Sequence, residues 1–135
     1  MKSLSKHAEA VFRAAMARCG EAGHCKIDGR PGTFMALCVE RIGTVDYYGA
    51  IFPLWSFAHY GEQNGDAMRD PDVVMMDGDK LGLYPVSFRN DYLGVDNESL
   101  VYEDGRVTGH RPKMQASITS FCATWARNLK DQQGL

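Results

Sequence analysis

The amino-acid sequence predicts an α+β fold, in which N-terminal and C-terminal helices cover one face of a curved antiparallel β-sheet meander. Apolar stripes of helical period lie near both ends of the chain. Between them, short apolar runs alternate with Asp-Gly pairs of the kind that close hairpins. Its 135 residues, without repeat or linker, predict a single domain over residues 1–135. We therefore expect two terminal helices packed on a sheet.

The N-terminal helix is predicted from the spacing of its apolar side chains. These are Leu4, Ala8, Val11, Phe12, Ala15 and Cys19. Steps of three and four residues place them on one face of a helix. Gly20 and Gly23 stand where such a helix should end.

Two apolar segments follow that are typical of strands. Residues 33–39 are short, apolar on both faces and preceded by turn-forming residues 28–32, which favours a buried strand. A second pattern runs from Tyr47 to Tyr60. Because Pro53 within it cannot donate a ladder hydrogen bond, we expect an edge position or a bulge there.

The second strand is apolar on both faces. Trp55, Phe57 and His59 share one face, while Phe52 and Leu54 lie on the other. A sheet with one solvated face does not require this much apolar surface. We therefore expect either a homodimer or a second buried face.

The remaining elements are predicted from turns and one last stripe. Asp-Gly pairs at 77–78 and 104–105 are each flanked by strand-like residues, which indicates hairpins and an antiparallel meander. Pro112 suits the first turn of a helix that ends near Gly134. Its apolar stripe consists of Ile118, Phe121, Cys122, Trp125 and Leu129.

The composition narrows the function classes. A formal net charge of -2 argues against direct nucleic-acid binding by a basic surface. Residues 1–16 lack the apolar core of a signal peptide, and no apolar run has the length of a membrane span. We expect a cytoplasmic protein with no membrane association.

The cysteines are irregularly spaced and three of the four fall in apolar patterns, so we expect reduced packing residues without a disulfide. Cys19, His24 and Cys25 superficially suggest zinc. They contain no CxxC pair, and we interpret them as packing residues too.

A polar segment, residues 59–72, directly follows the second predicted strand. Polar groups at a strand end are held by the sheet yet open to solvent, an arrangement common in binding sites. A second polar block, residues 88–92, is a candidate for the opposite wall of the same site. The candidate binding residues are His59, Tyr60, Glu62, Gln63, Asn64, Asp66, Asp70, Arg89 and Asn90.

Metal binding at the polar segment has weak support. His59, Asp66, Asp70 and Asp72 supply imidazole and carboxylate ligands suited to a divalent cation. Their spacing matches no metal-binding motif. We therefore assign no metal and no cofactor.

Two further interpretations of the polar segment differ in chemistry. His59 with Glu62 or Asp66 would exchange protons near neutral pH, although no nucleophile is evident beside them. A structural role is favoured, because Asn64-Gly65 and Asp70-Pro71 are turn formers.

Arg89 in the second block likewise has two interpretations. Its guanidinium offers a fork for a carboxylate or phosphate, which Asn90 and Asp91 would hold in place. A strand-end turn in which Arg89 pairs with a nearby acid is favoured.

The polar segment also carries a recognisable motif, His-Tyr-x-x-Gln-Asn-Gly-Asp-x-x-x-Asp-Pro. Its residues are His59, Tyr60, Gln63, Asn64, Gly65, Asp66, Asp70 and Pro71. The motif resembles an uncharacterised bacterial family often encoded on plasmids and integrative elements, and residues 84–94 and 120–134 resemble its other blocks. The family pattern has an aromatic where Gly61 stands and a glutamine where Arg89 stands. This resemblance implies a setting in mobile DNA, with roles in transfer, maintenance or evasion of host defence.

Two functions from different classes follow. The leading hypothesis is a non-enzymatic accessory protein of mobile-element type, which contacts a protein partner such as a host defence or DNA-processing complex through acidic side chains and the exposed sheet face. Carboxylates can imitate the spacing of phosphate charge on such a partner. The alternative is a small ligand- or metal-binding domain, or an enzyme, with a cleft formed by His59, Asp66, Asp70 and Arg89.

Overall fold

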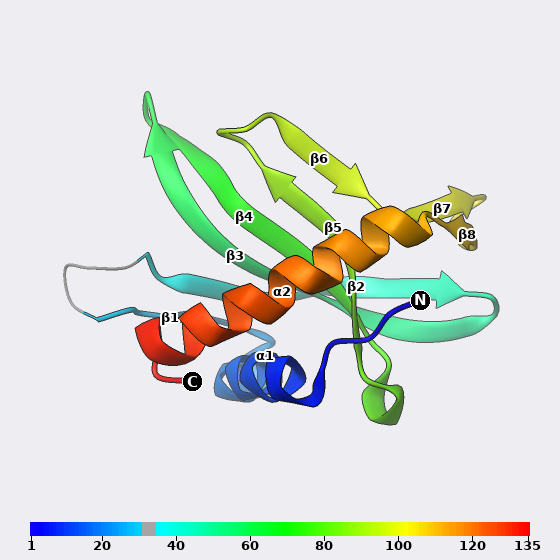
Figure 1. Ribbon diagram of the computed structural model, residues 1–135, viewed down its shortest axis with the longest axis horizontal. Coiled ribbons are helices and arrows are strands. Elements are labelled where there is room, and N and C mark those ends of the chain that lie inside the picture. The colour runs from blue at the N-terminus through cyan, green and yellow to red at the C-terminus, as the bar shows by residue number, and fades with distance from the viewer. Residues whose placement is uncertain (31–34) are drawn as a thin grey trace.

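The computed structural model describes residues 1–30 and 35–135, and these form two α-helices on one face of an eight-stranded sheet (Figure 1). The predicted α+β fold class and curved sheet are confirmed. In chain order, with the short 3₁₀-helices labelled η, the elements are α1 (Lys6–Cys19), η1 (Gly20–Ala22), β1 (His24–Ile27), β2 (Leu37–Tyr47), β3 (Ala50–Gln63), β4 (Asp66–Asp77), η2 (Asp79–Leu81), β5 (Leu83–Asn90), β6 (Val95–Glu98), β7 (Leu100–Glu103), β8 (Arg106–His110) and α2 (Pro112–Gln132).

The strands follow the order β6-β5-β4-β3-β2-β8-β7, and β1 pairs separately with β2. Strands β2 to β6 form the predicted antiparallel meander, whereas β8 returns to pair in parallel with β2. Strands β6 and β7 lie at opposite ends of this order, yet only Ser99 separates them in the chain. The sheet therefore curves until its two end strands meet. At that corner the Ser99 backbone N–H and Oγ both donate to the Val86 carbonyl, over 2.8 and 2.7 Å.

The helices and one sheet face enclose a first apolar core, here called the helix-side core. Phe12 of α1 lies between Phe57 of β3 and Trp125 of α2, with ring centroids 5.0 and 5.6 Å away. Ser5 caps α1 by accepting a hydrogen bond from the Ala8 N–H, and Pro112 occupies the first turn of α2 as predicted.

A second apolar cluster fills the concave face that the helices leave free. Its buried members are Val45, Val74, Met76, Val86, Leu100 and Val107. Strands β7 and β8 supply two of these residues, because the sheet curvature brings both over the meander. Of the two sequence-based expectations for this face, the second buried face is present.

Some predicted boundaries differ from the structure. Strand β2 begins at Leu37 and continues to Tyr47, while Thr33 and Phe34 of the predicted strand lie outside the described residues. The extension was missed because residues 40–44 are exposed and lack an apolar alternation. Strand β1 was missed for a related reason, since Ile27 is its only fully buried residue.

The two predicted Asp-Gly turns and the predicted position of Pro53 can also be compared with the structure. Asp104-Gly105 forms the predicted two-residue turn, with φ of 51° and 77°. The turn after Asp77 is longer than predicted, because η2 is inserted there. Strand β3 lies inside the sheet, but its ladder with β4 begins only at Leu54, so Pro53 has the local edge position that was expected.

The four cysteines are free thiols, and Cys19 and Cys122 lie in the helix-side core. Within residues 1–30 and 35–135, no group of three or more His, Cys, Asp or Glu side chains is arranged to hold a metal ion. Neither described α-helix is long and apolar enough to cross a membrane.

Candidate functional site

The polar segment lies in a long hairpin and not in a loop after a strand. Strand β3 continues to Gln63, which pairs with Asp66 of β4, and Asn64-Gly65 is a two-residue turn with φ of 53° and 85°. The strands continue through polar residues because backbone pairing does not require apolar side chains. The hairpin end projects away from both helices (Figure 1).

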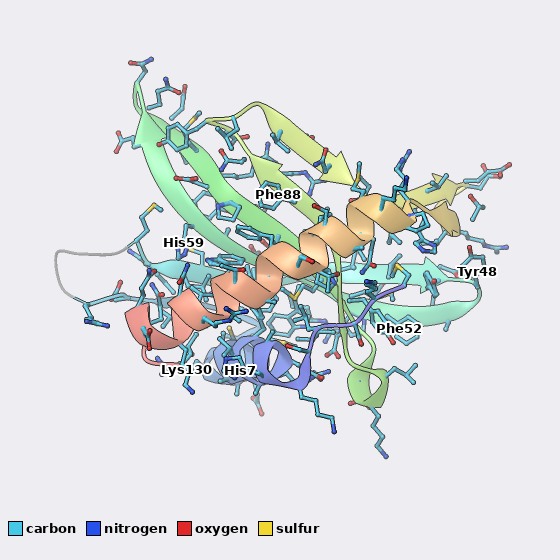
Figure 2. All side chains as sticks on the ribbon, in the orientation of Figure 1. His7, Tyr48, Phe52, His59, Phe88 and Lys130 are labelled. Carbon is cyan, nitrogen blue, oxygen red and sulfur yellow. The ribbon has the colours of Figure 1, made fainter. Side chains whose placement is uncertain are left out.

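His59 is not part of the exposed hairpin end. It shares the predicted face with Trp55 and Phe57, and only 6% of its surface is exposed. Trp125 Nε1 donates to His59 Nε2 over 3.2 Å, and His59 Nδ1 lies 3.0 Å from the Ala36 carbonyl. His59 is labelled in Figure 2. Because an indole N–H can only donate, Nε2 accepts and Nδ1 carries the proton that is donated to Ala36. The two ring nitrogens therefore join β3 to α2 and to Ala36, the residue before β2.

Asp70 and Pro71 form a bulge inside β4, where the sequence predicted a turn. Together they oppose His59, since Tyr60 pairs with Arg69 and Ala58 with Asp72. Proline fits such a position because a bulge leaves a backbone N–H without a ladder partner. The Asp70 carboxylate accepts a 3.0 Å hydrogen bond from Asn90 Nδ2. The two predicted polar blocks are thus brought together by this pair.

An ion pair next to this contact joins the hairpin to the turn between β5 and β6. Arg69 donates to Asp91 through Nη2 over 2.9 Å and through Nε over 3.1 Å. The Asp91 carboxylate also accepts from the Arg69 backbone N–H over 2.7 Å, and the Asp91 N–H donates to the Arg69 carbonyl over 2.9 Å. We call this set of contacts the Arg69–Asp91 clamp. The side-chain hydrogen bond from Arg69, and next its backbone N–H, lower the pKa of Asp91 below its usual value.

The clamp supports the exposed end of the hairpin, here called the hairpin platform. It consists of Tyr60, Glu62, Gln63, Asn64, Asp66, Tyr92 and Leu93. Strand alternation places Tyr60 and Glu62 on one face of the hairpin and the Tyr92 ring, which covers Gly61, on the other. Tyr60 and Tyr92 are each 45% exposed and Leu93 is 72% exposed. Tyr92 Oη donates to the Glu62 carbonyl over 3.3 Å, and its ring lies directly over Gly61, where a side chain would collide with it. The Tyr92 ring therefore occupies the space that a side chain at position 61 would need.

Arg89 lies on the concave face, away from His59. Its Nε lies 3.0 Å from Asp96 Oδ1 in an ion pair, and its Nη1 donates to Ser87 Oγ over 3.0 Å, so the favoured interpretation, pairing with a local acid, is observed. Arg89 also lines a cavity of about 310 Å³ to which His59, Asp66 and Asp70 do not contribute. Adjacent residues of a strand project from opposite faces, so Arg89 points away from Asn90 and from Asp70, to which Asn90 is bonded. The predicted four-residue cleft is therefore not assembled.

The sequence matches one family over residues 6–135, described as a domain of unknown function, DUF6908. The chain belongs to this family. No curated protein and no solved structure shows a significant match to it. Membership agrees with the predicted resemblance to an uncharacterised family, while the bacterial and mobile-element setting stays a prediction.

Several residues that build these sites were not candidates from the sequence. Arg69 was passed over, and Asp91 was considered only as a support for Arg89, because only the strand register, with its bulge, brings Arg69 and Asp91 together. Glu98 and Tyr102 on the cavity wall belong to no motif. No sequence signal marked them, because their place on the cavity wall depends on how the strands that flank Ser99 pair in the sheet.

Proposed function

We propose that this protein is a non-enzymatic accessory protein that binds a protein partner through the hairpin platform. The proposed setting is a mobile element, and the proposed partner is a host defence or DNA-processing complex. The observation that carries the proposal is the Arg69–Asp91 clamp, which fixes two separate turns relative to each other.

The clamp supports a role in binding because it orders an exposed surface. A simple surface ion pair contributes little to stability. The clamp adds a backbone hydrogen bond from the Asp91 N–H to the Arg69 carbonyl and one from the Arg69 N–H to the Asp91 carboxylate. Asn90 and Tyr92 make further contacts with the hairpin. Ordering a surface before association lowers the entropy cost of binding.

The chemistry of the platform favours a basic partner. Asp91 neutralises Arg69, whereas Glu62 and Asp66 are exposed at the tip. Tyr60 and Tyr92 add the aromatic surface that is enriched in protein interfaces. Acidic groups beside aromatic rings are complementary to the basic surface with which such a partner would bind nucleic acid.

A shared cleft of His59, Asp66, Asp70 and Arg89, which the alternative function requires, gains no support from the geometry. His59 is buried, Asp66 is exposed at the hairpin tip, Asp70 is bonded to Asn90, and Arg89 lies on the concave face. A cleft that combines these side chains would require a different strand register.

A pull-down from the native host tests the proposal. The wild-type protein should retain a DNA-binding protein and should compete with duplex DNA for it. The double variant Glu62→Lys/Asp66→Lys should weaken this binding at least about tenfold, since each close charge pair contributes on the order of 1 kcal/mol or more. The matched variant Glu21→Lys/Asp28→Lys changes the same charge at exposed sites elsewhere and should bind normally.

Two outcomes would contradict the proposal. One is equal capture of the partner by the wild type and the platform variant. The other is a homodimer in sedimentation that dissociates in the platform variant, since the platform would then serve self-association.

A further inference from the structure

The cavity beside Arg89 opens on the concave face of the sheet and has a volume of about 310 Å³. Side chains from every strand between β2 and β7 line it. Leu54, Val74 and Val86 form an apolar floor, and the two valines are also buried members of the second cluster. The floor is therefore a fixed part of the fold.

One wall of the cavity is polar because of the register between β5 and β6. Ser87 pairs with Glu98, and Arg89 pairs with Asp96, so these side chains project from the same face. Arg89 donates a hydrogen bond to Ser87 and forms an ion pair with Asp96. A guanidinium has five N–H groups. Among the described residues, these two contacts leave donors of Arg89 for a ligand.

Glu98 and Tyr102 complete this wall. Burial raises the pKa of Glu98, an effect that the hydrogen bond with Tyr102 and the charge of Arg89 oppose. Burial, followed by the charge and hydrogen bond of Glu98, raises the pKa of Tyr102 to about 12. A partly desolvated carboxyl beside an arginine interacts more strongly with a ligand than it would in water.

The combination of Arg89 and Glu98 restricts the ligand. Arginine only donates hydrogen bonds, whereas a carboxylate only accepts them. An anionic ligand would be repelled by Glu98, and a cationic ligand by Arg89. An uncharged group with an acceptor beside a donor satisfies both, and the cyclic amide of a lactam has this arrangement.

The apolar floor restricts the rest of the ligand. It favours a flat ring body, and the partly exposed ring of Tyr102 offers a stacking surface at the rim. A volume of about 310 Å³ is near the lower end of small-molecule sites, which span roughly 300 to 1,000 Å³. One ring or two fused rings would fit.

We propose that this cavity binds a small, uncharged, flat ring compound through a lactam edge, whose carbonyl accepts from Arg89 and whose N–H donates to Glu98. This site lies on the concave face and does not depend on the hairpin platform or its partner.

Titration of the wild-type protein with carbostyril, a fused bicycle with one lactam, tests the proposal by NMR. Saturable shifts of the Val74 and Val86 methyl signals are expected. The O-methyl ether of carbostyril keeps the rings but lacks the N–H, and quinaldate carries a carboxylate in its place. Both should bind at least about tenfold more weakly, because a hydrogen bond to a charged group contributes roughly 1.5 to 3 kcal/mol.

The variants Arg89→Ala and Glu98→Ala should each weaken carbostyril binding by at least about tenfold, while Glu21→Ala should not. Thermal melts verify that the variants fold, and the comparison of ligands on the wild type needs no variant. Absence of saturable methyl shifts, equal binding of the ether, or preferred binding of quinaldate would each overturn the proposal.

Discussion

The indole N–H of Trp125 on α2 donates to Nε2 of His59 on β3 across a distance of 3.2 Å. The two rings meet edge to face with centroids 5.4 Å apart. This contact fixes the His59 tautomer and fastens the C-terminal helix to the strand that enters the hairpin platform. His59 therefore has a structural role, although it stands in the most function-like segment of the sequence.

Replacing Trp125 should separate its packing from its hydrogen bond. Trp125→Ala should cost about 3 to 5 kcal/mol of unfolding free energy, as other large-to-alanine core changes do. Trp125→Phe keeps much of the ring and should cost less, with the loss of the bond to His59 contributing about 1 to 3 kcal/mol. Urea denaturation measures both, and unchanged midpoints would refute the packing described for α2.

Asp66 and Asp70 should respond differently to alanine. Asp66 is exposed at the hairpin tip, so Asp66→Ala should change stability by no more than about 0.5 kcal/mol. Asp70→Ala removes the acceptor of Asn90, a buried residue, and should cost about 1 to 2 kcal/mol. Thermal melts with and without divalent metal provide the measurement, and an equal loss in both variants would argue against this assignment.

The Arg69–Asp91 clamp should give the protein a pH-dependent stability. Because the pKa of Asp91 is lowered in the folded protein, its stabilising effect is present above the pKa of the unfolded chain and is lost as pH falls through the folded value. The stability difference between wild type and Asp91→Asn should therefore be largest near neutral pH and shrink in acid. Denaturation curves across that range test this, and a pH-independent difference would contradict it.

Two glycines of the hairpin should behave in opposite ways. Gly61→Ala should displace the Tyr92 ring at little cost in stability, because the nearest atoms belong to the outer end of a side chain. Gly65→Ala meets no neighbour but must hold a φ near 85°, which should cost roughly 1 kcal/mol. Tyr92 ring NMR signals and thermal melts distinguish the two, and an unmoved Tyr92 in Gly61→Ala would be inconsistent with the contact.

Native thiol reactivity should be low at two cysteines. Burial, assisted by a hydrogen bond with Cys25, raises the pKa of Cys19 to about 12, and burial raises that of Cys122. Little thiolate forms at pH 8, so alkylation of both should be slow in the folded protein and fast in urea. Mass spectrometry after iodoacetamide treatment measures this. Rapid native labelling of Cys122 would show that α2 does not cover it.

The helices were predictable because their signals are local. A repeat of three and four residues in both helices and a proline in the first turn of α2 each act within one element. The Asp104-Gly105 turn was predictable for the same reason, since its backbone angles depend on those two residues.

The sites were less predictable because they depend on register. A single bulge at Asp70-Pro71 decides that Arg69 meets Asp91 and that Asp70 meets Asn90. The polar composition marked the right segment, but it could not place His59 in the core or Arg89 on the opposite face. Those positions follow from contacts with α2 and β6, which are distant in the chain.

The corner at Ser99 also bears on aggregation. Strands β6 and β7, which terminate the strand order among the described residues, have four residues each. An open sheet usually presents long rows of unpaired backbone groups on which strands of other molecules can assemble. Here one bent segment supplies both terminal strands, so each offers only a short template. Loss of the two hydrogen bonds from Ser99 to the Val86 carbonyl should open this corner, lengthen that template and promote edge-to-edge association.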